Sequence, residues 1–324
     1  MKTNKGTILH DHNRDGLDRR GFLQCMAWAG TGMLWTVRGG LLGSALLPSS
    51  ARAAEVAETT RGSFSFVQIS DSHIGFNKEG INTDVAGTLQ EAIARINALP
   101  ERPEFVLHTG DLTHLASADE FDTLDQLLKG VKTQQIFFVP GEHDVTSDNG
   151  KLYLERFGKN SKGAGWYSFD HHGIHFVGLV NVVEIQQNGL GALGKEQLAW
   201  LDDDLRGRSA ETPIVVFAHI PLWEVYPQWG WGTDDGAQAL ALLKRFGSVT
   251  VLNGHIHQTM KKVEGSVTFH TARSTAFAQP TPGTAPKPGP MKIESAKLRE
   301  HLGITEVNYV EGTHSLAIVD SALL

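Results

Sequence analysis

One recurring arrangement constrains the fold of this sequence more than any other feature: short apolar runs lead directly into aspartate or histidine. The runs are rich in Val, Ile and Phe, as strands buried on both faces are, and lie at Phe64–Ile69, Phe105–His108, Gln135–Val139, Ile214–Phe217 and Val249–Leu252. Stretches with helical spacing separate them, at Val85–Leu99, Ala118–Leu128, Lys195–Leu205 and Ala237–Phe246. This alternation predicts a layered α/β fold whose strands end at a common ligand-binding edge.

The remaining segments fit the same fold. Further strands are predicted at Ile174–Val180, Val267–Thr271, Thr305–Tyr309 and Ser315–Val319, with a helix near Ala296–Leu302. A stretch dense in Pro and Gly, Gln279–Pro290, is predicted to be an extended surface loop. No shift in composition after residue 63 marks a second domain.

Composition narrows the possible functions. The 324 residues contain 29 Lys+Arg and 36 Asp+Glu, a net charge of −7, which argues against a basic surface for long nucleic acids. With 40% hydrophobic residues the chain can bury a sizeable core, which excludes wholesale disorder. The single cysteine, Cys25, excludes an intramolecular disulfide and a cysteine-cluster metal site. The unusual feature is the 15 histidines, whose positions carry the functional prediction.

The N-terminal segment resembles a twin-arginine export signal. Arg19-Arg20 precedes a moderately apolar run, Phe22–Leu47, and residues 51–53 (Ala-Arg-Ala) fit the pattern before a cleavage site. We predict a signal peptide over residues 1–53 and one domain over 54–324. The resemblance implies contact with the twin-arginine export machinery, a periplasmic location and no stable membrane association after cleavage. The alternative is an uncleaved membrane anchor, which Arg38 inside the run disfavours.

The side chains that follow the predicted strands form a set of oxygen and nitrogen donors without sulfur. The set is Asp71, His73, Asp111, Glu142, His143, Asp144, His219, His255 and His257. Carboxylates and imidazoles together suit Mn, Fe or Zn, and the donors are too many for one ion. Two ions would need a shared ligand, for which Asp111 is the natural residue. Metal pairs of this kind activate water and stabilise an oxyanion, which is the chemistry of phosphate-ester hydrolysis.

In order along the chain, the pattern Asp-x-His, Gly-Asp, Gly-x-His-Asp, His, Gly-His-x-His closely resembles the calcineurin-like metallophosphoesterase superfamily. The resemblance implies a four-layer α/β/β/α sandwich with two mixed sheets and a centre of two divalent or mixed-valence ions. The ligands it implies are Asp71, His73 and His257 for the first metal, Asp111 as the bridge, and His219 and His255 for the second. His143 corresponds to a general acid near the leaving group, and Asp144 is expected to orient His143 or brace its loop.

Two positions leave alternatives open. Glu142 stands where the superfamily usually has Asn, so the formal charge of the carboxylate ligands becomes −3 instead of −2. A trivalent ion could restore the balance, catalysis could weaken, or Glu142 could turn away and leave its place to water. His114, three residues after Asp111, either ligates the first metal, supports His143, or merely lies near the site.

Further residues are predicted to form the rim of a substrate cleft: Trp223, Tyr226, Trp229, Trp231 and Arg273. The aromatic side chains either stack on a substrate or form a packing cluster under a long loop. Arg273 either steadies a phosphate or is an ordinary surface arginine. Asn181, at the end of another strand, is expected to point toward the site.

These features predict a metal-dependent phosphoesterase, either a phosphomonoesterase or a phosphodiesterase, that hydrolyses small organic or nucleotide phosphoesters. The acidic composition makes a long nucleic acid an unexpected partner. The alternative from another class is a non-hydrolytic metal- or phosphoester-binding protein of the same fold, silenced by Glu142 in the usual Asn position.

Overall fold

The computed structural model describes residues 33–38, 41–46, 62–133, 135–310 and 316–324. The chain divides into two units, Met1–Arg61 and Gly62–Leu324. In the first unit, β1 (Met33–Arg38) pairs antiparallel with β2 (Leu41–Leu46). The arginine pair and the cleavage segment of the predicted signal peptide lie outside the described residues. Among the described residues, no helix has both the length and the apolar character needed to cross a membrane.

The second unit contains two mixed sheets. The five-stranded sheet has the order β13 (Ala317–Ala322), β12 (Gly303–Tyr309), β3 (Phe64–Ile69), β4 (Phe105–His108), β5 (Gln135–Phe138). The six-stranded sheet has the order β10 (Lys261–Glu264), β11 (Val267–Thr271), β9 (Val249–Asn253), β8 (Ile214–Ala218), β7 (Ile174–Gly178), β6 (Tyr167–His171). The central strands are parallel, and antiparallel partners extend the sheets at β12–β13, β10 and β6.

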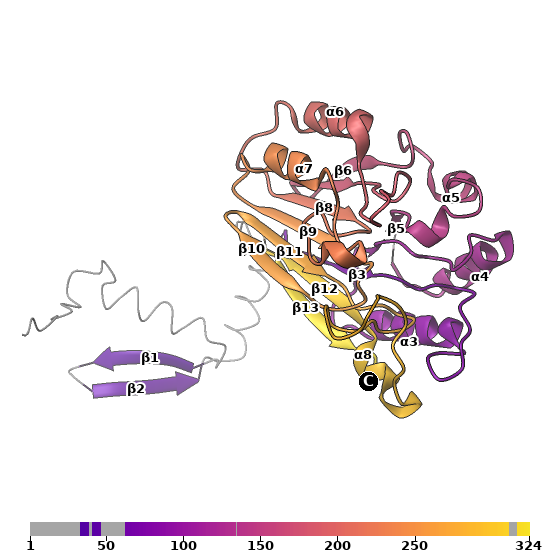
Figure 1. Ribbon diagram of the computed structural model, residues 1–324. Helices are drawn as coiled ribbons and strands as arrows, with labels where there is room; N and C mark the ends of the chain where they lie inside the picture. The colour runs from indigo at the N-terminus through magenta and orange to yellow at the C-terminus, as the bar shows by residue number, and fades with distance from the viewer. Residues whose placement is uncertain (1–32, 39–40, 47–61, 134, 311–315) are drawn as a thin grey trace, which may run out of the picture. The chain divides into compact units, whose positions relative to one another are not determined.

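Helices cover the outer face of each sheet, which produces four layers (Figure 1). α3 (Val85–Asn97), α4 (Ala118–Leu128) and the short α8 (Leu298–His301) lie beside the five-stranded sheet, and α6 (Gly194–Leu205) and α7 (Gly236–Leu243) lie beside the other. The remaining helical segments are η1 (Glu142–Asp144), α5 (Lys151–Phe157), η2 (Pro227–Trp229) and η3 (Ser295–Lys297). The predicted α/β/β/α sandwich is therefore confirmed.

Several predicted boundaries differ from the structure. The strand expected over Ile174–Val180 ends at Gly178, and the one expected over Ser315–Val319 is β13, which runs from Ala317 to Ala322. The helix expected near Ala296–Leu302 consists of η3 followed by α8. The sequence pattern predicts that these strands and helices exist, but packing and the register of strand pairing decide the residues at which they end.

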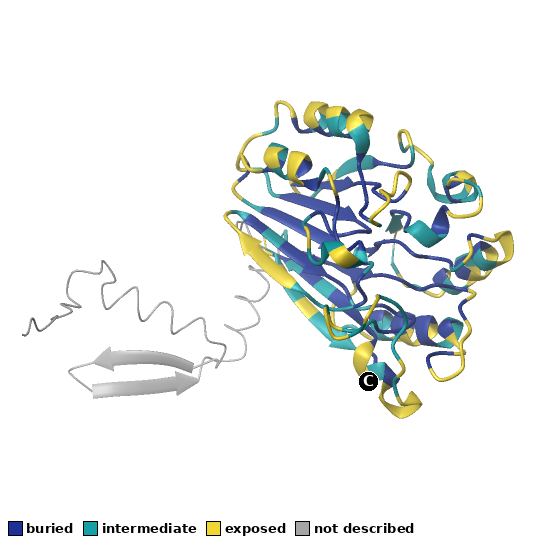
Figure 2. Ribbon diagram, in the orientation of Figure 1, coloured by how far each residue is buried: buried dark blue, intermediate teal, exposed yellow. Residues whose placement is uncertain are grey.

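Burial explains why the strands are apolar along their whole length. In β3, Phe64 and Phe66 pack between the sheets, whereas Val67 and Ile69 pack beneath the helices, as the two-residue period of a strand requires. Figure 2 shows the central strands buried and the helices exposed on their outer faces.

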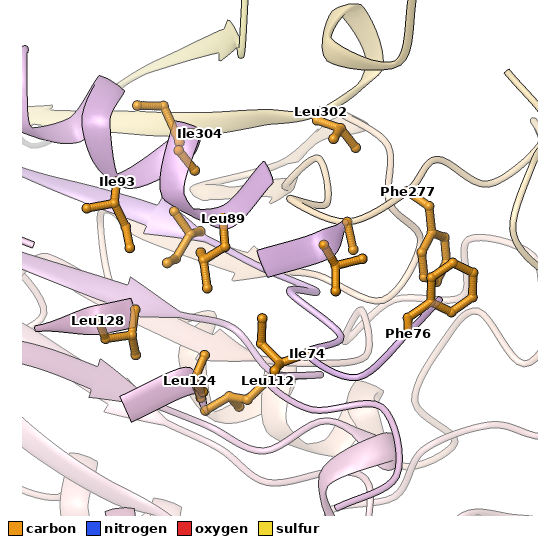
Figure 3. Packing of buried hydrophobic residues seen from close by; sticks show 14 of the residues in the cluster. Ile74, Phe76, Leu89, Ile93, Leu112, Leu124, Leu128, Phe277, Leu302 and Ile304 are labelled. Carbon is orange, nitrogen blue, oxygen red and sulfur yellow. The ribbon is translucent and has the colours of Figure 1, made fainter. Parts of the chain in front are cut away.

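The helix α3 illustrates how local sequence sets an element and its face. Its N-terminus is capped by the Asp84 side chain, which accepts a hydrogen bond from the Gly87 N–H at 2.8 Å. Leu89, Ile93 and Ile96 recur at helical spacing and are buried against the five-stranded sheet. Figure 3 shows this cluster, which reaches from Leu128 and Ile304 to Phe76 and Phe277 near the candidate site.

Asp320 on β13 connects the two sheets at their edges. Its Oδ1 lies 2.9 Å from His270 Nε2 on β11 and accepts a hydrogen bond from Thr305 Oγ1 on β12 at 2.8 Å. Lys261 Nζ on β10 lies 3.2 Å from Oδ2. Burial raises the pKa of Asp320, but the interactions with His270, Thr305 and Lys261 together lower it to about 2.

We predict that Asp320→Asn lowers the free energy of unfolding by about 1–2 kcal/mol at pH 7. Because the folded pKa lies below the value of about 3.9 for an unfolded aspartate, the stabilisation is present above about pH 4 and is lost as the pH falls. Denaturant titrations of both proteins at pH 7 and pH 3 should show a smaller difference at pH 3. An equal difference at both pH values would contradict this role.

Candidate metal centre

The candidate ligands follow parallel strands of both sheets. Asp71 and His73 follow β3, and Asp111 follows β4 in the same sheet. His219 follows β8, and the pair His255 and His257 follows β9, in the other sheet. Residues separated by more than 180 positions in sequence therefore meet at one edge, as His257 and His73 do with Nε2 atoms 3.3 Å apart.

A first group of donors consists of Asp71, His73, Asp111 and His257, all buried, with donor atoms within 4.8 Å of one another. His73 Nε2 lies 3.4 Å from Asp111 Oδ2, and His257 Nε2 lies 3.3 Å from Asp71 Oδ1. Ligand atoms bonded to one ion at about 2.1 Å are separated by about 3–3.5 Å. The spacing of this group fits a single ion.

A second group consists of Glu142, His219 and His255. Glu142 Oε2 lies 2.9 Å from His219 Nε2, and its Oε1 lies 3.0 Å from His255 Nδ1. Asp111 Oδ2 is also 3.4 Å from His219 Nε2, the same distance that separates it from His73 Nε2 in the first group. A single Asp111 oxygen is therefore shared by the two groups.

The donor atoms of this second group are left without hydrogen bonds. Glu142 Oε2, His219 Nε2 and His255 Nδ1 are buried and have no hydrogen-bond partner, although they face one another at close range. Buried polar atoms without partners are costly, and a bound cation would satisfy all three. These residues fit a metal ion both in chemistry and in arrangement.

Backbone carbonyls fix the orientation of two of the histidines. His219 Nδ1 donates to the Thr109 carbonyl at 2.7 Å, and His257 Nδ1 donates to the Phe277 carbonyl at 2.6 Å. In a neutral ring this leaves the Nε2 lone pair directed into the centre, as metal-binding histidines require. Burial lowers the pKa of His73 well below its ordinary value, which also favours the neutral form.

The backbone is strained at the same residues. Asp71, His73, Asp111, His255 and His257 have φ angles of 55°, 41°, 51°, 68° and 54°, in the left-handed region that favours glycine. Such strain costs of the order of 1 kcal/mol per residue and persists where the surrounding structure enforces it, typically at functional sites. Five of the six candidate aspartate and histidine ligands share this feature.

His143 and His114 form a stacked pair beside the first group. Their ring centroids are 4.8 Å apart at an interplanar angle of 17°, and His143 Nδ1 lies 2.7 Å from the His114 carbonyl, to which it donates. His114 Nδ1 lies 3.5 Å from His73 Nδ1, and the His143 backbone N–H donates to Asp111 Oδ1 at 3.0 Å. Of the alternatives for His114, contact with His143 is present, and its ring also lies beside His73.

Asp144 braces the loops instead of touching the His143 ring. It accepts hydrogen bonds from the backbone N–H groups of Leu112, Thr113 and Gly141 and from Thr113 Oγ1, at 2.8–3.0 Å. Burial and the charge of Asp111 raise the pKa of Asp144 to about 7, against these hydrogen bonds. Asp144 thereby ties the loop after Asp111 to the start of η1.

The carboxylate of Glu142 is directed into the centre. Burial alone would raise its pKa, but the neighbouring His255 and His219 hold the pKa of Glu142 well below its ordinary value. For His143, burial acts to lower the pKa, and the carboxylates of Asp111 and Glu142 outweigh it, so the pKa is raised.

Two residues that the sequence reasoning did not single out for the site support these ligands. The Phe277 ring packs against the rings of His73 and His257, with centroids 4.7 Å and 4.5 Å away, and Figure 3 shows it beside Phe76 at the end of the core cluster. Ser274 Oγ donates to the Asp71 carbonyl at 2.7 Å. The available signal was position, because both residues follow β11 at the edge where the ligands lie.

The residues predicted for the rim have varied surroundings. Trp231 is buried and packs against Trp229, which packs against Tyr226, while Trp223 packs against Phe269 in the core. These contacts support the packing cluster among the two alternatives, and a role in substrate binding stays a prediction.

Arg273 and Asn181 have defined positions as well. Arg273 lines a pocket of about 260 Å³ whose lining also includes His257, and its Nη1 donates to the Glu300 carbonyl at 2.8 Å. Asn181 is buried and donates to the Ile220 carbonyl and to Thr233 Oγ1, both at 2.8 Å, so it holds the segment that follows His219.

Gly141 allows Asp111 to occupy its position. A Cβ atom at Gly141 would lie 2.1 Å from Asp111 Oδ1 and 2.3 Å from its backbone nitrogen. We predict that Gly141→Ala displaces the Asp111 carboxylate and lowers the bound metal per chain at least twofold, measured by elemental analysis after gel filtration. Gly247→Ala is the matched control, since its Cβ would meet only the Ala210 carbonyl, at 3.7 Å. Equal metal content in the two variants would contradict the prediction.

Comparison with known proteins agrees with the geometry. Residues 64–259 match the family described as calcineurin-like phosphoesterase. The glycerophosphodiester phosphodiesterase GpdQ of Enterobacter lignolyticus is 24% identical over 77% of this chain and 90% of the relative. The serine/threonine-protein phosphatase CPPED1 of Bos taurus is 27% identical over 53% of this chain and 61% of the relative.

Among solved structures, a dimetal phosphatase from Danio rerio has a similar fold, with a TM-score of 0.59 and 15% identity over 81% of this chain and 96% of that chain. A purple acid phosphatase from Lupinus luteus has a TM-score of 0.58 and 14% identity over 81% of this chain and 52% of that chain. The predicted superfamily and the predicted metal-dependent phosphoesterase are thus confirmed at the level of the family. The chain belongs to the calcineurin-like phosphoesterase family.

Proposed function

We propose that the protein binds two metal ions, Mn, Fe or Zn, and hydrolyses small organic or nucleotide phosphoesters. The observation that carries this proposal is the position of Asp111 Oδ2, 3.4 Å from Nε2 of both His73 and His219. One carboxylate oxygen between two groups of donors is the arrangement a metal pair about 3.5–4 Å apart needs. When bound, such a pair would supply Lewis-acid stabilisation of phosphoryl oxygens and would activate water.

The ligands we assign follow the two groups. Asp71, His73 and His257 would hold the first ion, Glu142, His219 and His255 the second, and Asp111 both. The substrate class is supported by relatives named as a glycerophosphodiester phosphodiesterase and as cyclic nucleotide phosphodiesterases. These two names support small phosphoesters as the substrate class proposed for this chain.

His143 is the residue we assign as general acid. Its Nδ1 is engaged by the His114 carbonyl and its backbone by Asp111, so the remaining ring nitrogen, Nε2, is the one free to donate a proton to a leaving oxygen. His114 would keep this ring in place through the stacked contact. A non-hydrolytic binding protein is the rival proposal, favoured by the extra carboxylate of Glu142 beside His219 and His255.

We predict that His143→Ala retains about two metal ions per chain and lowers kcat for an aryl phosphoester by roughly 100-fold or more. The physical reason is that the variant loses the proton donor but no assigned ligand. Elemental analysis and steady-state kinetics on aryl phosphate monoesters and diesters check both parts. A wild-type protein with two ions and no turnover of any ester on the panel would favour the rival.

We also propose that the protein is exported through the twin-arginine route to the periplasm. The support is the Arg19-Arg20 pair and the Ala-Arg-Ala segment at 51–53. The mature protein would then begin at Ala54 and have no stable contact with the membrane.

N-terminal sequencing of the exported protein should begin at Ala54, and Arg19→Lys with Arg20→Lys should leave the full-length chain in the cytoplasm. Recovery of the intact chain, with Phe22–Leu47 still present, in the membrane fraction would instead show an anchor.

A further inference from the structure

The residue that departs from the superfamily pattern, Glu142, has its carboxylate among the metal donors. Its two oxygens lie 2.9 Å from His219 Nε2 and 3.0 Å from His255 Nδ1, and the side chain is 23% exposed. Of the alternatives open from sequence, a Glu142 turned away from the centre therefore does not match the structure. The carboxylate charge of Glu142 lies among the donors of the second group.

The charges around the centre can be counted. The donors include three carboxylates, Asp71, Asp111 and Glu142, and four histidines, His73, His219, His255 and His257. Within the described residues, the ion pairs of these three carboxylates are all with histidines, so no Lys or Arg offsets them. Two divalent ions would leave a net charge of +1, where a neutral residue at position 142 would leave +2.

This difference acts unequally on the two kinds of phosphoester. A phosphomonoester carries two negative charges at neutral pH, since its second pKa is about 6, and a phosphodiester carries one. Lowering the net charge of the centre by one unit, at about 4 Å from the phosphate, weakens the attraction of a dianion about twice as much as that of a monoanion. At the effective dielectric of a partly buried site, this difference in lost attraction favours the diester over the monoester by roughly tenfold or more.

A second feature concerns space beside the centre. The pocket of about 260 Å³ has His257 in its lining, together with Gln258, Arg273 and Gln279. A monoester has no second organic group to place there, whereas a diester retains one after the leaving alcohol departs. The lining offers such a group the polar side chains of Gln258 and Gln279 and the cation of Arg273, beside the carboxylate of Glu300.

We propose that Glu142 makes this centre selective for phosphodiesters over phosphomonoesters. The inference rests on the proposed function. Hydrolysis forms one P–O bond to the oxygen of water, breaks one P–O bond to the alcohol and passes one water proton to the leaving oxygen, which His143 delivers. The products are an alcohol and a phosphomonoester, which releases the second proton of the water to the solvent at neutral pH and becomes a dianion. The same charge balance disfavours a second hydrolysis of that product.

The test compares two substrates with the same leaving group, bis(4-nitrophenyl) phosphate and 4-nitrophenyl phosphate, on protein loaded only with Zn²⁺ or only with Mn²⁺. We expect kcat/KM for the diester to exceed that for the monoester at least tenfold, with the product monoester accumulating. Glu142→Gln, which keeps the shape and removes the charge, should lower this ratio at least tenfold. Glu142→Asn is the second variant, and Glu264→Gln on the exposed edge strand β10 is the control that should leave the ratio unchanged.

An independent readout is ligand binding without turnover. Calorimetry at pH 8 should show that Glu142→Gln binds inorganic phosphate, mainly a dianion, at least tenfold more tightly than the wild type. The gain for dimethyl phosphate, a monoanion, should be smaller. Metal content is measured first, so that each comparison is made at two ions per chain.

Three results would overturn the inference: a wild-type preference for the monoester, a trivalent ion in the protein as isolated, or variants with two ions but unchanged ratio and phosphate affinity. If neither variant folds, a wild-type kcat/KM that favours the monoester still overturns the inference. Failure of the proposed function looks different, because then neither ester is hydrolysed while the phosphate affinities still report the effect of Glu142.

Discussion

The structure depends on one carboxylate, Asp111, placed between donors that come from two separate sheets. Its Oδ2 is 3.4 Å from a histidine that follows β3 and 3.4 Å from a histidine that follows β8. Neither sheet alone carries both groups of donors. The sandwich has to bring the ends of the two parallel strand sets together before a centre exists, and the apolar cluster between the sheets, with Phe66, Phe176 and Phe217, provides that packing.

Several contacts hold Asp111 in place although they lie outside the donor set. The Asp144 carboxylate accepts hydrogen bonds from the backbone N–H of Leu112, the residue after Asp111, and from the N–H of Gly141. Because Gly141 has no side chain, the Asp111 carboxylate has room beside it. Phe277 packs on His73 and His257 and continues the core cluster beneath α3. The strained φ angles at the donors show that the surrounding packing, rather than local preference, sets their backbone.

Much of this arrangement was predictable from sequence, for a physical reason. A buried strand that runs into Asp or His places a polar side chain at the edge of the sheet, so β3, β4, β8 and β9 identified both fold and donors. The sequence pattern could not decide whether Asp144 orients His143 or braces its loop, because the choice depends on which backbone groups lie against the Asp144 carboxylate in the fold. Phe277 and Ser274 were missed as site residues, because a core phenylalanine and a loop serine look ordinary until β11 pairs beside β9.

Anomalous diffraction from crystals of the metal-loaded protein tests most directly whether Asp111 lies between two metal ions. We expect two peaks about 3.5–4 Å apart, one on each side of Asp111 Oδ2 and within about 2.0–2.3 Å of a carboxylate oxygen or a ring nitrogen from each group. A single peak, or a pair of peaks with no Asp111 oxygen between them, would contradict the account.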